Sequence, residues 1–168
     1  MQRLLHRATL GLLIGFACSL CACSSQSSRA GDPGAIAGGA GSTVGCRPSD
    51  ADVYSAGMTK PGAAGHFEFT LVSSTPAPPA LGDNRFLVQV SDADGNAMSG
   101  DLSVALEMPE HGHSSPAPEV GFDPENGVFS LQPVRLFMVG LWRASFAFQG
   151  SLDGVPLTDS AVFELCID

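Results

Sequence analysis

Six short stretches of the chain alternate between apolar and polar residues. In residues 66–72, Phe67, Phe69 and Leu71 are separated by Glu68 and Thr70. A period of two places these two sets of side chains on opposite faces of a β-strand. The same alternation recurs in residues 85–90, 102–108, 127–132, 141–148 and 160–167. Each stretch therefore predicts a half-buried antiparallel strand.

Segments rich in Gly, Pro, Asn and Asp separate these strands, among them PAPPALGDN, DADGNAMSG and QGSLDG. No stretch keeps the apolar period of an amphipathic helix long enough to predict one. With a seventh strand near residues 119–122, the pattern predicts an all-β fold, an immunoglobulin-like antiparallel β-sandwich of about seven strands. Trp142 stands in the middle of a late strand, where we expect it to fill the core between the sheets.

The N-terminal residues have the pattern of an export signal. Arg3 and Arg7 precede an apolar run that is too short to span a bilayer well. The run ends in LCAC at residues 20–23, which resembles the lipobox of bacterial lipoproteins, although Cys21 stands where Ala, Ser or Thr is commoner. The resemblance implies that residues 1–22 are a signal peptide and that Cys23 is lipidated. The alternative is a soluble secreted protein that is cleaved nearby.

Residues 23–45 are rich in Ser, Gly and Ala and contain no aromatic residue. Such a chain cannot bury enough apolar surface to offset its ordering entropy, so we expect a flexible tether. The domain is then expected over residues 46–168. By resemblance to Gram-negative lipoproteins, Ser24 after the lipidated cysteine favours anchoring to the outer membrane, facing the periplasm.

The charge balance limits the choice of partners. Once Arg3 and Arg7 are removed with the signal peptide, six Lys and Arg face 17 Asp and Glu, which gives a net charge of −11. A chain of this charge is a poor candidate for binding nucleic acid or anionic lipid, and it attracts cations.

Two cysteines bracket the predicted domain. Cys46 stands where the tether ends, and Cys166 stands two residues before the C-terminus. In an exported protein this arrangement predicts a disulfide that joins the entry to the last strand. Cys166 falls on the face of that strand that points away from the core. The alternative, in which both cysteines are metal ligands, lacks another thiophilic residue close to either one in sequence.

The segment MPEHGHSS brings together two of the three histidines that remain after signal removal, His111 and His113. We expect it to be a loop, because Pro109 ends the preceding strand and Gly112 separates the histidines. In an extended segment, residues two apart lie about 6.6 Å from each other on the same side. Two imidazoles so placed can bind one metal ion, although exposed loop histidines without a ligand are common.

Two methionines extend this candidate site. Met108 ends one predicted strand, and Met138 precedes another; if those strands are antiparallel neighbours, the two methionines meet. Thioether and imidazole ligands suit copper, above all Cu(I). The alternative for each methionine is to fill a gap in the core. Zinc is the second candidate metal, because two imidazoles and the carboxylate of Glu110 would serve it, whereas the copper site leaves Glu110 outside the ligand set.

Several motifs together resemble the YtkA-like domain, a family related to the FixH proteins of cytochrome oxidase maturation. They are the Pro-rich approach to GDN, the MPEHGH core and the MVGLW segment, within residues 57–166. Val139 stands where the family often has proline. The resemblance implies a small exported or membrane-anchored sandwich that handles copper, with a copper-handling or cytochrome oxidase assembly protein as its partner.

Enzyme motifs are missing from the sequence that follows the signal peptide: it has no G-x-S-x-G elbow, no H-E-x-x-H, no C-x-x-C and no phosphate loop. We therefore expect a protein that is not an enzyme. The favoured function is an envelope-anchored, copper-binding accessory protein that delivers or buffers copper or serves oxidase maturation. The alternative is a metal-free structural or interaction module of an envelope complex. The sequence assigns no role to His66 or Met58.

Overall fold

The computed structural model describes Cys46 and residues 50–168. The predicted signal peptide, Cys23 and the predicted tether lie outside the described residues. No helix in the part of the chain that the structure describes has the length and hydrophobicity to span a bilayer.

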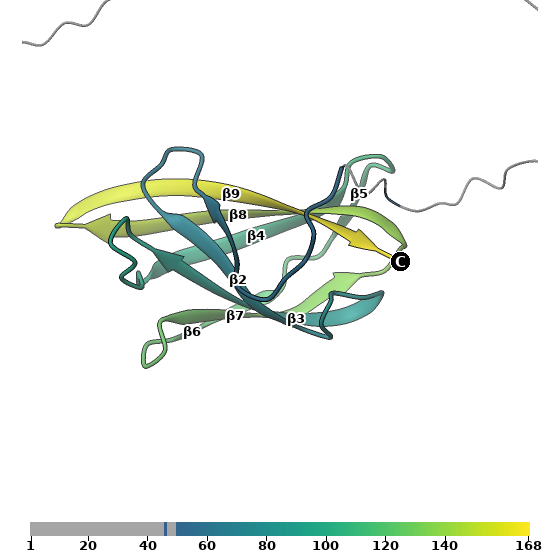
Figure 1. Ribbon diagram of the computed structural model, residues 1–168, viewed down its shortest axis with the longest axis horizontal. Coiled ribbons are helices and arrows are strands. Elements are labelled where there is room, and N and C mark those ends of the chain that lie inside the picture. Colours follow the sequence, from purple (N-terminus) through teal and green to yellow (C-terminus); the bar gives the residue numbers. More distant parts are fainter. Residues whose placement is uncertain (1–45, 47–49) are drawn as a thin grey trace, which may run out of the picture. The chain divides into compact units, whose positions relative to one another are not determined.

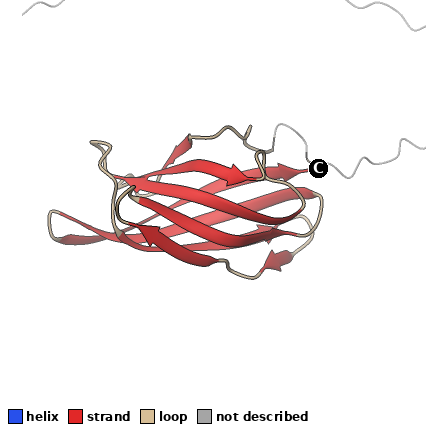
Figure 2. Cartoon of the chain, turned by 90° about the horizontal axis from the view of Figure 1, so that it is seen from below, coloured by secondary structure: helices blue, strands red, loops and turns tan. Residues whose placement is uncertain are grey.

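The described residues form two antiparallel sheets that pack face to face (Figures 1 and 2). The five-stranded sheet has the order β1-β2-β3-β7-β6, and the four-stranded sheet has the order β5-β4-β8-β9. The strands are β1 (Met58–Pro61), β2 (Glu68–Thr75), β3 (Gly82–Ser91), β4 (Gly100–Met108), β5 (His113–Ser115), β6 (Glu119–Asp123), β7 (Val128–Leu136), β8 (Gly140–Leu152) and β9 (Val155–Ile167). The predicted all-β sandwich is confirmed.

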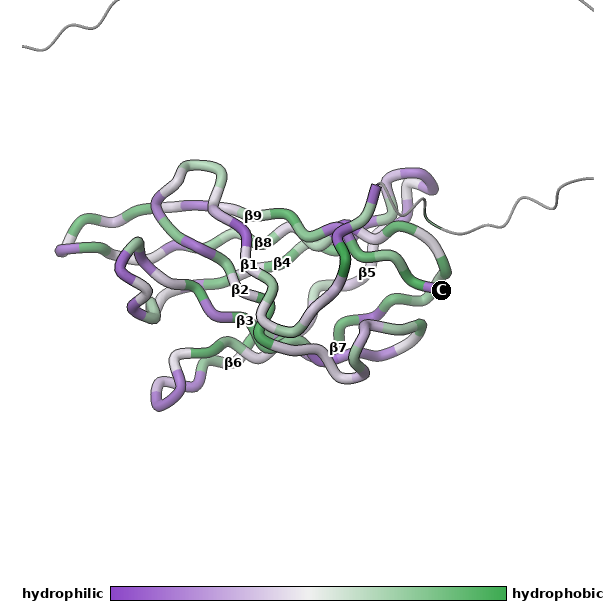
Figure 3. Tube along the Cα trace, viewed as in Figure 1, coloured by the Kyte–Doolittle hydropathy of each residue, from purple (hydrophilic) through white to green (hydrophobic). Residues whose placement is uncertain are grey.

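The core lies between the sheets and is built from the alternate residues of each strand. Trp142 is fully buried, as expected. Apolar residues are distributed along all the long strands, whereas the β4–β5 and β6–β7 turns are strongly hydrophilic (Figure 3). The largest buried side chains are Trp142, Phe69, Phe86, Phe129, Phe146, Phe148 and Phe163.

The structure has nine described strands rather than the predicted seven. The two unpredicted strands, β1 and β5, are short edge strands of four and three residues, too short for an alternation to be recognised. The segment QGSLDG, which was predicted as a turn, is a turn only at its last two residues. The strands continue through Leu152 and resume at Val155, because a two-residue turn at Asp153 and Gly154 adopts the positive φ values of 52° and 79° that a tight hairpin requires.

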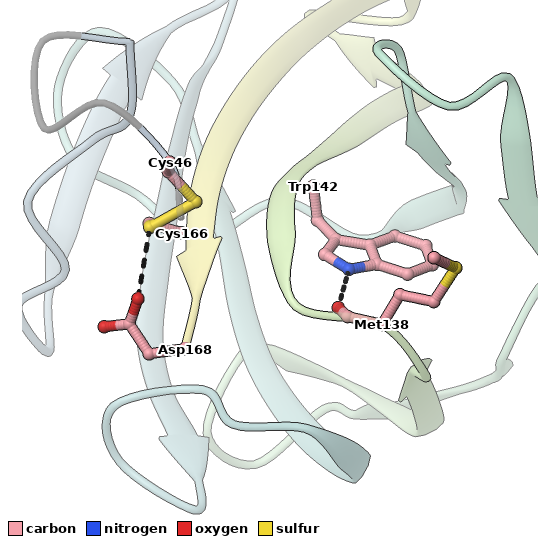
Figure 4. The surroundings of a disulfide bond; sticks show 5 residues. All are labelled: Cys46, Met138, Trp142, Cys166 and Asp168. Atoms are coloured by element: carbon pink, nitrogen blue, oxygen red, sulfur yellow. Dashed lines mark hydrogen bonds between the residues drawn. A yellow bond between two sulfur atoms is a disulfide. The ribbon is translucent and has the colours of Figure 1, made fainter. Parts of the chain in front are cut away.

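Cys46 and Cys166 form the predicted disulfide, with Cα atoms 5.6 Å apart. This separation lies within the usual range for a disulfide. Cys166 lies between the buried Leu165 and Ile167, so it points to the outer face of β9. Figure 4 shows the bond beside the C-terminal end of β9. It ties the start of the domain to its last strand.

Candidate functional site

The candidate metal ligands lie at one end of the sandwich, where β4 leads into β5 and β7 leads into β8. As expected, β4 and β8 are antiparallel neighbours: Leu106 faces Ala144, and Glu107 faces Arg143. The end of β4 therefore lies beside the start of β8. This topology brings the β4–β5 turn, which contains His111, next to the connection that contains Met138.

His113 and Met138 are in direct contact. Nδ1 of His113 lies 3.1 Å from Sδ of Met138, although the two residues are 25 positions apart. His113 is exposed and Met138 is half-buried. An imidazole nitrogen and a sulfur that bind one ion at about 2.0–2.3 Å each lie roughly 3–4 Å apart. The observed contact is therefore compatible with one ion held by both side chains.

Trp142 holds the connection that carries Met138. Its indole Nε1 donates a hydrogen bond of 2.8 Å to the carbonyl oxygen of Met138 (Figure 4). The indole ring also packs edge-to-face on Phe137, with ring centroids 5.1 Å apart. Because Trp142 is itself fixed in the core, it fixes the backbone of the methionine as well. The sequence indicated only a core role for this tryptophan.

The two histidines do not lie in one extended loop, which corrects the sequence expectation. His113 begins β5 and pairs with Met108, whereas His111 lies in the tight turn before it. The amides of His111 and Gly112 both donate to the carbonyl oxygen of Met108, at 3.1 and 2.9 Å, and Gly112 has a φ of +64°. Pro109 directly follows the last residue of β4, as expected, but only four residues, 109–112, separate β4 from β5.

The imidazole rings of His111 and His113 nevertheless remain neighbours, with centroids 6.1 Å apart and planes inclined by 31°. Two imidazoles that share an ion at about 2.0 Å have centroids roughly 5–6 Å apart. The observed separation is close to this range.

Met108 lies directly behind this pair. It is fully buried in the core and faces His113 across the β4–β5 ladder. Cross-strand partners place their Cβ atoms about 4.5–5.5 Å apart on the same face of a sheet. Gly140 makes room for the methionine, because a Cβ atom there would lie 2.9 Å from Met108 Cε. Met108 therefore fills a gap in the core, which was the alternative role expected for it. Its role as a metal ligand stays a prediction.

Among the described residues, no group of three or more His, Cys, Asp and Glu is placed to hold a metal ion. Glu110 is exposed in the β4–β5 turn. A metal bound by His111 and His113 would need thioether or other ligands in addition.

Phe137 lies next to the site, and the sequence did not indicate this residue. Its ring centroid lies 6.4 Å from that of His113, and 48% of its surface is exposed. Val139 on the other side of Met138 is also exposed, and so is Leu81, which precedes the Gly82–Leu136 pair. The only signal in the sequence was the position of Phe137 and Val139 beside Met138.

Three charged residues on β4, β8 and β9 are paired with one another. Arg143 Nη2 lies 2.9 Å from Glu164 Oε1, and Arg143 Nη1 lies 3.5 Å from Glu107 Oε1. The hydrogen bond with Glu164 and the negative charges of both glutamates raise the pKa of the Arg143 guanidinium above its ordinary value, despite partial desolvation. This cluster lies on the outer face of β4, β8 and β9, on the opposite side of β4 from Met108.

Comparison with known proteins finds no matching family model, no matching curated protein and no matching solved structure. The resemblance to the YtkA-like family therefore rests on the sequence motifs alone and stays an expectation.

Proposed function

We propose that this protein is a copper-binding accessory protein of the cell envelope that delivers or buffers Cu(I). The observation that carries the proposal is the 3.1 Å contact between His113 and Met138. A soft thioether beside an imidazole suits Cu(I), whereas magnesium and calcium prefer oxygen ligands. His111 supplies a second imidazole from the adjacent turn.

The location of the site supports transfer rather than permanent storage. His111 and His113 are exposed, so a partner can reach an ion held between them. The backbone of Met138 is anchored from within by Trp142, so the site combines one ligand on a fixed backbone with two accessible ones. The partner in this proposal is a copper-handling or cytochrome oxidase assembly protein. Anchoring through a lipid on Cys23 is part of the same proposal and would keep exchange close to the membrane.

Competition with a Cu(I) chelator tests the metal site. The variant His111→Ala/His113→Ala and the variant Met138→Leu should each lose more than about tenfold in Cu(I) affinity, since even residues that only orient ligands change affinity by about 10–100-fold. Met108→Leu measures the contribution of the buried methionine separately. His66→Ala and Met98→Leu are matched controls, because His66 lies before β2 and Met98 lies at the opposite end of β4.

Equal affinities in all these variants would refute the site. A loss in the double histidine variant alone would indicate a histidine site for zinc or Cu(II) instead. Because copper exchange requires only the domain, Cys23→Ala should leave Cu(I) affinity unchanged while it releases the protein from the membrane fraction.

A metal-free interaction module is the second candidate function. It is favoured by the exposed apolar side chains of Leu81, Phe137 and Val139 at the same end of the sandwich. Exposed apolar groups that cluster on one surface mark contact sites for other proteins. In that case Phe137→Ser would abolish recovery of a cross-linked envelope partner, and the double histidine variant would retain it.

A further inference from the structure

A hollow of about 420 Å³ opens on the outer face of the five-stranded sheet, away from the candidate copper site. Its wall residues on β3 and β7 alternate with the core residues Phe86, Val88, Phe129 and Leu131, so they point outward. The hollow is lined by Val72, Arg85, Leu87, Gly121, Phe122, Asp123, Asn126, Val128 and Ser130. The space is of the size that small-molecule sites have in proteins.

Small residues on neighbouring strands create the depression. Ser130 of β7 lies directly opposite Leu87 of β3 on one side and Gly121 of β6 on the other. A Cβ atom at Gly121 would lie 3.1 Å from Ser130 Oγ, so any larger side chain there would begin to fill the floor. An irregularity in β2 between Leu71 and Ser73 adds Val72 to the apolar wall next to Leu87.

The charged groups at the two sides of the hollow differ in their existing partners. Asp123 accepts hydrogen bonds from Asn126 Nδ2 and from the amides of Glu125 and Asn126, and these bonds lower its pKa. Within the described residues, Arg85 has no ion pair, and Ser130 has no side-chain hydrogen bond. The group still available to a charged ligand is therefore the guanidinium of Arg85.

We propose that this hollow binds a small amphipathic monocarboxylate. The guanidinium of Arg85 binds the carboxylate, which it can do with two parallel hydrogen bonds. The apolar body lies over Leu87, Val72 and Val128, and the hydroxyl of Ser130 is available at the floor. Asp123 repels a second negative charge at the far side, so the ligand carries one carboxylate and an uncharged remainder.

Titration of the full-length chain with phenylbutyrate tests the proposal, with backbone amide chemical shifts as the readout. Saturable shifts are expected at Leu87, Gly121 and Ser130. Arg85→Gln should weaken binding roughly tenfold or more, because it removes a charge-assisted pair. Gly121→Val should weaken it by filling the floor, and valine suits a strand. Arg135→Gln is the matched control, since Arg135 lies on the outer face of β7 and pairs with Asp83 instead.

Two further probes separate the parts of the proposal. Phenylbutylamine has the same apolar body with a positive charge, and acetate has the carboxylate without the body; both should bind at least about tenfold more weakly than phenylbutyrate. Equal binding of the amine, unchanged affinity in Arg85→Gln, shifts confined to other residues, or no binding of phenylbutyrate would each overturn the proposal. If Gly121→Val does not fold, the Arg85 and Arg135 variants still decide the outcome.

Discussion

Strand β9 and strand β6 lie at edges of different sheets. Another segment of the chain covers the edge of β9, whereas the edge of β6 is open in the described residues. β9 is covered at several points between Asp159 and Cys166: the amides of Asp52 and Ala63 donate hydrogen bonds of 2.7 Å to the carbonyl oxygens of Glu164 and Ser160. In Figure 1 the dark blue segment that enters the domain crosses β9. In the described chain, β6 has no strand on its outer side, and its Val120 and Phe122 are partly exposed.

Three kinds of interaction close the β9 edge, and two of them use a carboxylate. Asp52 Oδ2 accepts the amide of Glu164 at 2.7 Å, so a side chain pairs with β9 as a strand would. Asp159 accepts the amides of Ala64, His66 and Phe67, which fixes the β1–β2 turn. The disulfide of Cys166 completes the cover. An exposed strand edge is a template for aggregation, and here it is protected by a segment of the same chain.

The comparison indicates that stability is concentrated at the covered edge, whereas the open edge remains accessible. Gly121 in the middle of β6 weakens a strand, yet it forms part of the floor of the hollow described above. We expect loss of the interactions that cover the β9 edge to cost far more stability than a substitution at the open edge of β6.

Loss of the disulfide should have the largest effect. Cys46→Ser/Cys166→Ser opens a loop with a sequence separation of 120 residues. In the chain-entropy model this lowers the free energy of unfolding by about 4–5 kcal/mol. Urea unfolding measures the loss. Reduction of the unmodified protein should reproduce it, and a midpoint that is equal with and without reductant would contradict the prediction.

Asp159→Ala should follow, with a loss of about 3 kcal/mol, because it leaves buried backbone amides without an acceptor. Asp159→Asn retains one acceptor oxygen and should lose less. Burial raises the pKa of Asp159, but hydrogen bonds from the amides of Ala64, Ser160, His66 and Phe67 outweigh it and lower the pKa below its ordinary value. Its contribution to stability is therefore complete above the pKa of the unfolded chain, about 3.9, and is lost as the pH falls through the lower folded value.

The pH dependence is measured by urea unfolding as the pH is lowered from neutral to acid. The unmodified protein should lose stability below about pH 4, and Asp159→Ala should lose less over the same interval. Parallel curves for the two proteins would contradict the assignment to Asp159.

Asp52→Ala should cost about 1 kcal/mol, since it removes the acceptor for the Glu164 amide and the 2.6 Å ion pair with Lys60. Asp83→Ala is the matched control. Its 3.3 Å ion pair with Arg135 is more exposed and lies away from β9, so the change should be close to zero. If thermal unfolding gives equal losses in both variants, Asp52 does not stabilise the domain by covering the β9 edge.

Val120→Thr on β6 should have the smallest effect, below about 0.5 kcal/mol. Val120 is 39% exposed and lies on a strand whose other edge is open. Val162→Thr on β9 is matched in residue type and in exposure, also 39%. Since both side chains reach solvent, the two variants should differ little in urea unfolding, whereas amide exchange should be faster in β6 than in β9. Faster exchange in β9 would reverse the comparison.

The sequence predicted the long strands because each carries several large apolar residues at alternate positions, as in Phe67, Phe69 and Leu71. It did not predict β1 and β5, whose few residues are extended because of their neighbours and not because of their own pattern. The disulfide followed from the positions of the two cysteines. Strand alternation and the positions of cysteines can both be recognised in a single sequence.

The site was predicted only in part, for a related reason. The antiparallel pairing of β4 with β8 explains why His113 and Met138 meet, and it could be expected from strand order. The hydrogen bond from Trp142 to Met138 and the burial of Met108 depend on how the side chains pack. The spacing of residues along the sequence does not reveal that packing. The hollow depends on the register that sets Ser130 opposite both Leu87 and Gly121, and the irregularity between Asn84 and Phe86 of β3 shifts that register.

The disulfide also determines how the domain responds to mechanical tension. A pull on the chain before Cys46 is transmitted through the sulfur–sulfur bond to Cys166, so the residues up to β1 carry little of the load. The load enters β9 at its C-terminal end, where the strand is paired with β8 over thirteen consecutive residues. The load therefore reaches the longest ladder of the described sheets and bypasses the short edge strand β1.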